Sequence, residues 1–129
     1  MALTKNNPVL CIENEIIFEY HEDEVITVDI AHYAARERKR LAGDKKMPLM
    51  VAFKRLFGFS PDTRDMDTDV ILANVSALGF YVEDNEHKIP ESEKQLILSF
   101  YETTPWPVPV NVFFNKQEGI EWLQGFIEE

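Results

Sequence analysis

Short apolar runs separated by polar turns open the chain. Residues 9–12 form one run and residues 16–18 a second, and Ile16, Phe18 and Tyr20 occupy alternate positions, which is the pattern of a half-buried strand. The polar break at 13–15 predicts that the two runs pair as a β-hairpin.

Helical spacing follows the hairpin. Thr27 can cap a helix through its hydroxyl, and Ile30, Ala34 and Leu41 mark the side that we expect to be buried. Gly43 ends the pattern, because glycine accepts the left-handed backbone found after many helices.

The middle of the chain alternates strand and helix signals. Residues 48–53 and 77–82 are nearly continuous apolar runs, which is typical of central strands covered on both faces. Between them Ser60, followed by Pro61, signals the start of a helix that extends through Leu72.

The last part repeats the alternation. Ser92 with Gln95 predicts a third helix start, and the proline-rich residues 105–109 predict a stiff connector to a final strand at 110–114. Asn115 with Glu118 then caps a fourth helix.

The expected order is therefore β-β-α-β-α-β-α-β-α. Strands that alternate with helices favour an α/β fold with a mixed, mostly parallel five-stranded sheet and four helices. We expect one domain over residues 1–129, with a flexible N-terminus at 1–8.

The net charge of the chain limits the kinds of partner that we expect. The formal net charge is −10, which would repel a phosphate backbone, so we expect no binding of nucleic acid. One dense basic run interrupts this acidity, and we interpret it as a solvated helix face, with an anion-binding patch as the alternative. The run consists of Arg36, Arg38, Lys39 and Arg40, followed by Lys45 and Lys46.

Cys11 is the only cysteine, so no disulfide can form within the chain, as suits a reducing compartment. Residues 1–8 have no apolar signal core, and no apolar run approaches the roughly 20 residues of a membrane span. We expect a cytoplasmic protein without a membrane span.

The element order and the final segment resemble a known family. Residues 109–115 form a strand and capping residue, and residues 118–123 form an acidic helix with Trp122 and Leu123. This ending is similar to that of small bacterial SpoIIAA-like domains, which share the fold of anti-sigma-factor antagonists and STAS domains. The resemblance implies a SpoIIAA-like fold.

In regulators of that family, a serine or threonine at the start of the helix after the third strand is phosphorylated, which releases a bound partner. The matching residue is Ser60, where helix amides would stabilise a phosphate. The Asp-Ser-Ser-Gly context of the family is absent and Pro61 follows. A plain helix cap is therefore the alternative reading of Ser60.

Catalytic and metal chemistry have no signature. Asp65, Asp67 and Asp69 match the first spacings of a calcium loop, but Val70 and Ser76 stand where glycine and glutamate are required. The histidines have no second ligand at metal spacing, and Cys11 is expected to be an inert buried thiol. We expect no enzyme activity, no cofactor and no bound metal.

The working surface is predicted at residues 54–64, after a central strand, together with the start of the following helix, where open α/β sheets bind partners. Its proposed contact residues are Leu56, Phe57, Phe59, Ser60 and Thr63. The alternative is that Phe57 and Phe59 both point inward and cover the core beneath this loop. The predicted function is a non-enzymatic regulatory or protein-interaction module that binds a protein partner or itself.

The alternative function is a carrier of a small apolar molecule. It requires a cavity of about 300 Å³ or more, lined by Phe80, Leu96, Phe100 and Trp106.

Overall fold

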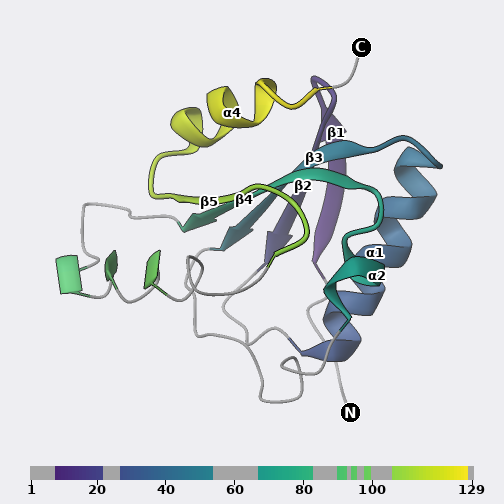
Figure 1. The fold of residues 1–129 in the computed structure, drawn as a ribbon, viewed down its shortest axis with the longest axis horizontal. Helices are drawn as coiled ribbons and strands as arrows, with labels where there is room; N and C mark the ends of the chain where they lie inside the picture. Colours follow the sequence, from purple (N-terminus) through teal and green to yellow (C-terminus); the bar gives the residue numbers. More distant parts are fainter. Residues whose placement is uncertain are drawn as a thin grey trace.

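The computed structural model describes residues 8–21, 27–53, 67–82, 90–92, 94–95, 98–99 and 106–127. Five strands form one sheet in the order β1-β2-β3-β4-β5 (Figure 1). The strands are β1 (Val9–Glu13), β2 (Ile16–His21), β3 (Met47–Phe53), β4 (Val75–Val82) and β5 (Val110–Phe113). The helices are α1 (Val28–Ala42), α2 (Thr68–Ile71) and α4 (Lys116–Gln124).

The sheet is mixed, as predicted. β1 runs antiparallel to β2, and β2, β3, β4 and β5 are mutually parallel. The hairpin is closed by Asn14 and Glu15, which have φ angles of 50° and 66°. Two positive φ values are typical of a type I′ turn, whose twist matches that of the flanking strands. The α/β class and the largely parallel sheet are thereby confirmed.

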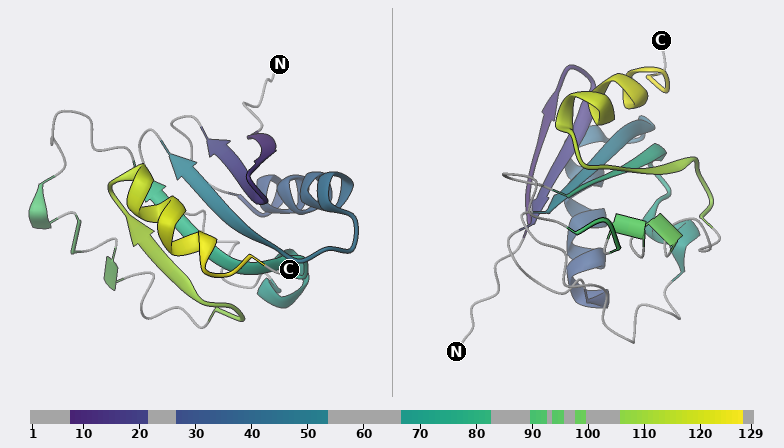
Figure 2. Two further views of the ribbon diagram at one scale, coloured as in Figure 1. Left: turned by 90° about the horizontal axis from the view of Figure 1, so that it is seen from above. Right: turned by 90° about the vertical axis from the view of Figure 1, so that its left-hand side faces the viewer.

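Strand order decides where the helices lie. Parallel strands that follow one another across the sheet need right-handed crossovers, and successive crossovers of that kind place their helices on the same face. α1 and α2 accordingly lie on one face, and α4 returns across the other (Figures 1 and 2). Of the predicted third helix, residues 91–92, 94–95 and 98–99 are helical, and the remainder lies outside the described residues.

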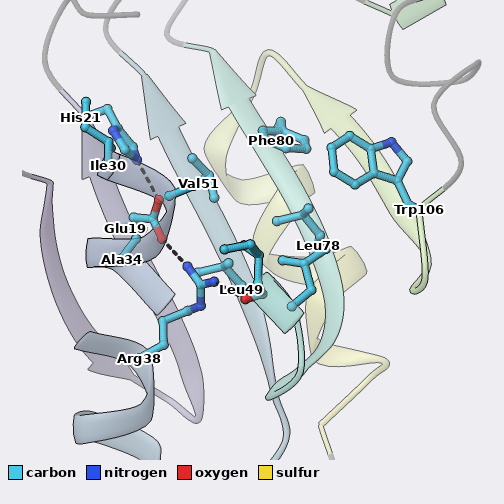
Figure 3. Close-up of a pocket in the computed structure, with 13 residues that line it drawn as sticks. Glu19, His21, Ile30, Ala34, Arg38, Leu49, Val51, Leu78, Phe80 and Trp106 are labelled. Atoms are coloured by element: carbon cyan, nitrogen blue, oxygen red, sulfur yellow. Dashed lines mark hydrogen bonds and ion pairs between the residues drawn. The ribbon is translucent and has the colours of Figure 1, made fainter. Parts of the chain in front are cut away.

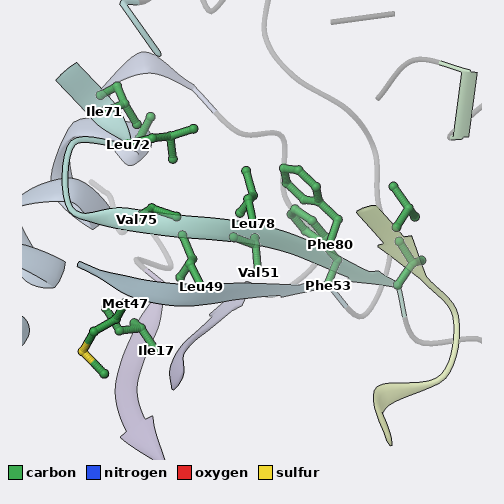
Figure 4. Packing of buried hydrophobic residues seen from close by; sticks show 13 residues of the cluster. Ile17, Met47, Leu49, Val51, Phe53, Ile71, Leu72, Val75, Leu78 and Phe80 are labelled. Carbon is green, nitrogen blue, oxygen red and sulfur yellow. The ribbon is translucent and has the colours of Figure 1, made fainter. Parts of the chain in front are cut away.

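Each face has its own core. The face under α1 and α2 carries the larger cluster (Figure 4). Its buried members are Ile17, Ala31, Met47, Leu49, Val51, Phe53, Ile71, Leu72, Val75, Leu78, Phe80, Val82 and Val112. The opposite face holds a smaller cluster against α4, made of Ile16, Phe18, Met50, Ala77 and Leu123.

Helix α1 begins and ends as predicted. The Thr27 hydroxyl accepts a hydrogen bond from the Ile30 amide at 3.2 Å, and Gly43 adopts a φ of 66° after the last turn. Both features satisfy backbone groups that a helix leaves unpaired at its ends.

Two expectations were wrong. Helix α2 begins at Thr68, because the Asp67 carboxylate accepts hydrogen bonds from the amides of Asp69 and Val70, so a continuous helix from Ser60 through Leu72 does not form. Strand β2 is also not half-buried. Ile17 belongs to the core cluster on one face and Phe18 to the cluster on the other, and Glu19 and His21 are as buried as Phe18.

Candidate functional site

The register of the sheet aligns the carboxyl ends of β2, β3 and β4. His21 pairs with Phe53, and Phe53 pairs with Val82, so the carboxyl ends of β2, β3 and β4 share one edge. Segments 22–26, 54–66 and 83–89 follow these strand ends in the sequence and lie outside the described residues. Parallel sheets commonly bind ligands and partners at such an edge.

A row of aromatic rings crosses the sheet near this edge, on the face under α1. His21 stacks on Phe53 with ring centroids 5.3 Å apart, and Phe53 stacks on Phe80 at 6.2 Å. Trp106 closes the row against Phe80 at 5.7 Å. Trp106 thus acts as a wedge from the proline-rich connector onto β4, where the Pro109 carbonyl also accepts a hydrogen bond from the Leu78 amide.

Next to this row lies a buried polar network (Figure 3). One oxygen of the Glu19 carboxylate accepts a hydrogen bond from Arg38 Nη1 at 2.7 Å, and the other lies 2.6 Å from His21 Nε2. The second Arg38 nitrogen donates to the Ile71 carbonyl at 2.7 Å. The network therefore ties β2, α1 and the end of α2 together beneath the helical layer.

Electrostatics keep the Glu19 carboxyl ionised. Burial alone would raise the pKa of Glu19, but the hydrogen bond with His21 and the charge of Arg38 outweigh burial and lower the pKa below its usual value. An ionised carboxylate can only accept hydrogen bonds, so His21 Nε2 carries the hydrogen that it shares with Glu19. Both oxygens of Glu19 are thus engaged.

A cavity of about 60 Å³ lies between this network and the aromatic row. It is lined by Glu19, His21, Ile30, Ala31, Ala34, Arg38, Leu49, Val51, Ile71, Leu72, Leu78, Phe80 and Trp106. Two residues predicted to line an apolar pocket, Phe80 and Trp106, are in its wall, and the other two, Leu96 and Phe100, lie outside the described residues. The cavity is smaller than the roughly 300 Å³ of typical ligand sites.

The predicted contact surface falls on a segment that the structure does not describe. Leu56, Phe57, Phe59, Ser60 and Thr63 all lie between Phe53 and Asp67, outside the described residues. The described positions on either side of them are the end of β3 and the start of α2.

The basic run is not one solvated face. Arg38 is only 3% exposed, because it lies on the side of α1 that faces the sheet and pairs with Glu19 there. Arg36, Lys39 and Arg40 are exposed, and local acids engage the last two, as Lys39 pairs with Asp44 and Arg40 with Glu37. This pairing weakens the case for an anion-binding patch.

Cys11 is half-buried, not buried as expected, and it lies on the edge strand β1 at the margin of the smaller core cluster. Partial burial and the neighbouring Glu13 carboxylate raise the pKa of its thiol, and Lys116 opposes them. A raised pKa makes the thiol less nucleophilic at neutral pH.

The network was missed, although the sequence contains a signal for it. Arg38 follows Ile30 and Ala34 at intervals of four, so it belongs to the buried stripe of α1. Glu19 lies two residues from Ile17 in β2 and therefore faces the same core. A basic residue in one buried stripe and an acidic residue in the other indicate a buried ion pair.

Within the described ranges, no group of three or more histidine, cysteine or acidic side chains could hold a metal ion. In the same part of the chain, no helix has the length and apolar character to cross a membrane.

Comparisons with known proteins agree with the fold. The family model "Domain of unknown function (DUF7793)" matches residues 10–127. Among solved structures, an uncharacterised protein of the DUF3478 family with a SpoIIAA-like fold, from Shewanella loihica PV-4, is similar with a TM-score of 0.56 and 13% identity, over 95% of this chain and 98% of that chain. Comparison with curated proteins gives no match. The predicted resemblance is confirmed at the level of fold: the chain belongs to the DUF7793 family and folds as a SpoIIAA-like domain.

Proposed function

We propose that the chain is a non-enzymatic regulatory module that binds a protein partner. The observation that carries this proposal is the closure of the buried network. Among the described residues, the ionisable groups that line the cavity are Glu19, His21 and Arg38, which are 4%, 3% and 3% exposed. An acid or base must reach a substrate proton within hydrogen-bond distance, and both Glu19 oxygens are already engaged inside the fold.

The partner surface that we propose is the edge where β3 ends, with Leu56, Phe57, Phe59, Ser60 and Thr63 as contact residues. Support comes from the strand register, which sets the ends of β2, β3 and β4 side by side, because segments 22–26, 54–66 and 83–89 follow those ends in the sequence. Segments 22–26 and 83–89 contain Glu22, Asp23, Glu24, Glu83, Asp84 and Glu86. An apolar centre with acidic neighbours suits a partner that has an apolar patch and a basic rim.

We also propose Ser60 as a phosphosite, because the resemblance to SpoIIAA-like regulators implies one at this position. A phosphate would add about two negative charges beside segments that are already acidic. The added negative charge would attract the basic rim of the partner. Release of the partner would therefore come from the bulk of the phosphate at the contact residues.

Affinity purification of the tagged chain from its native host tests the proposal. We expect the wild-type chain to recover a protein that Phe59→Ala loses, because truncation removes a large apolar contact. Val70→Ser is the matched control, since Val70 is 61% exposed on α2 and lies outside the proposed contact residues. Equal recovery by Phe59→Ala and wild type, with both variants folded, would contradict the proposed surface.

The second candidate function is binding of a small apolar molecule in the cavity. The observation in its favour is the apolar wall that includes Phe80 and Trp106. A volume of about 60 Å³ limits the occupant to a few heavy atoms or ordered waters. Native mass spectrometry of chain purified from its host tests this candidate, and the mass of the bare chain alone would count against it.

A further inference from the structure

Strand β1 is an edge strand whose outer side carries no partner among the described residues. It pairs with β2 on one side, and the sheet ends there (Figure 1). Val9 and Ile12 are 66% and 40% exposed, and with Val70 they are the large apolar residues exposed in the described part of the chain. Two of those three therefore lie on one edge strand.

The hairpin register shows which backbone groups face outward. Glu13 and Ile16 flank a two-residue turn, so they form a hydrogen-bonded pair, and every second pair along the ladder repeats that pattern. Val9, Cys11 and Glu13 thus direct their amides and carbonyls toward β2. Leu10 and Ile12 direct theirs to the open side.

The two edges of the sheet differ in protection. At β5 the Asn111 side chain accepts a hydrogen bond from the Val112 amide at 2.8 Å, and prolines precede the strand at 107 and 109. Such features discourage the addition of another strand. Pro8 precedes β1 in the same way, but β1 itself contains no proline and a single charged residue, Glu13, at its end.

We propose that β1 pairs antiparallel with β1 of a second copy, which joins two sheets into one about a twofold axis. In the register centred on Cys11, Leu10 of each copy faces Ile12 of the other, so all the outward backbone groups of both strands are used. Glu13 faces Val9, and like charges are not opposed. Registers centred on Leu10 or Ile12 leave part of the strand unpaired.

The second copy is favoured as the occupant because the strand complements itself in this register, both in hydrogen bonding and in apolar side chains. α1 packs against β1, so the twofold axis also brings the two α1 helices together on one face and extends the contact. The net charge of −10 on each copy opposes association. We therefore expect a weak dimer that salt strengthens by screening.

Sedimentation velocity measures the association directly. From about 5 µM to about 200 µM the sedimentation coefficient should rise toward that of a dimer, and it should rise at lower concentration when the salt is increased. Ile12→Lys and Ile12→Pro should stay monomeric, because a charge or a missing amide blocks the edge without removing a bond to β2. Val70→Lys is the matched control and should dimerise like wild type.

Disulfide trapping tests the register. Paired Cys11 residues would have Cα atoms about 4.5 Å apart, within reach of a disulfide. Diamide, which takes up the two electrons and two protons of the thiols, should therefore cross-link wild type at about pH 8.5. In a Cys11→Ser background, Val9→Cys and Glu13→Cys should each fail to cross-link alone, because each is roughly 13 Å from its own copy, and should cross-link when mixed.

Each result of these two experiments either supports or overturns the proposed dimer. Concentration-dependent dimers that Ile12→Pro abolishes, with cross-linking of the mixed variants, support the proposal. A wild-type chain that stays monomeric throughout, or dimers that persist in Ile12→Pro, would overturn it, whether the edge is then empty or holds a strand of another protein. Partner capture through Phe59 is a separate readout and is unaffected by either result.

Discussion

Arg38 lies where the apolar stripe of α1 calls for a hydrophobic side chain. Its guanidinium is buried against the sheet, and a charge removed from water is costly unless it is paired and hydrogen-bonded. Glu19 supplies the opposite charge, and the Ile71 carbonyl accepts a second hydrogen bond from the guanidinium. One arginine thereby fixes the relative positions of β2, α1 and α2.

Replacement of Arg38 alone should destabilise the fold more than replacement of Arg38 and Glu19 together. Arg38→Met leaves the Glu19 charge buried without its cation, so we expect a loss of about 3–5 kcal/mol in the free energy of unfolding. Glu19→Met with Arg38→Met removes both charges and leaves His21 and the Ile71 carbonyl short of a partner, at a cost of about 1–3 kcal/mol. Urea unfolding of the two single variants and the double variant at pH 7 measures the coupling, and additive losses would contradict an interacting pair.

Helix α4 covers its face of the sheet through close backbone approach. A Cβ on Gly119 would lie 2.6 Å from Met50 Cε and 3.2 Å from the Phe113 ring, so the end of the fully buried Met50 side chain would have to move before alanine could fit at this depth. Its N-terminus is fixed by the Asn115 side chain, which accepts a hydrogen bond from the Glu118 amide at 3.0 Å. Cap and contact together hold Leu123 over Gly79.

Gly119→Ala should therefore destabilise the fold although alanine favours helices. Overpacking costs about 1–3 kcal/mol and exceeds the gain of about 1 kcal/mol in helix propensity, so we expect a net loss of roughly 1 kcal/mol in urea unfolding. Gly125→Ala is the control, because the φ of Gly125 is −67° and a Cβ at this position would approach only the Trp122 carbonyl, at 3.4 Å. A stabilised Gly119→Ala variant would show that α4 docks less tightly than described.

Element boundaries that depend on neighbouring residues could be predicted from the sequence. The hairpin turn, both ends of α1 and the cap of α4 each depend on residues that are close in sequence to the groups that they position. The start of α2 was misplaced, because Ser60 and Asp67 are both good caps and the pattern alone does not rank them. The buried network was missed because Glu19 and Arg38 are 19 residues apart, and charged positions are ordinarily assigned to the surface.

The loss of stability of the whole fold at low pH should depend on Glu19. Its pKa is lowered in the folded chain, so its carboxylate stabilises the fold above the usual pKa of 4.5, and this contribution disappears as the pH falls through the folded-state pKa. Wild type should therefore lose more unfolding free energy than Glu19→Gln between about pH 5 and pH 3. Glu37 and Asp44, whose pKa values are also lowered, are present in both proteins. Parallel pH profiles in urea unfolding would contradict this role.

The central claim is that the buried network supports the fold and that a partner binds elsewhere, at the edge where β3 ends. Affinity purification from the native host with wild type, Glu19→Gln and Phe59→Ala side by side tests it most directly, with circular dichroism to establish that each variant is folded. The account predicts that Glu19→Gln recovers the same partner as wild type while Phe59→Ala loses it. Loss of the partner by folded Glu19→Gln, with recovery by Phe59→Ala, would contradict the account and make the cavity the working site.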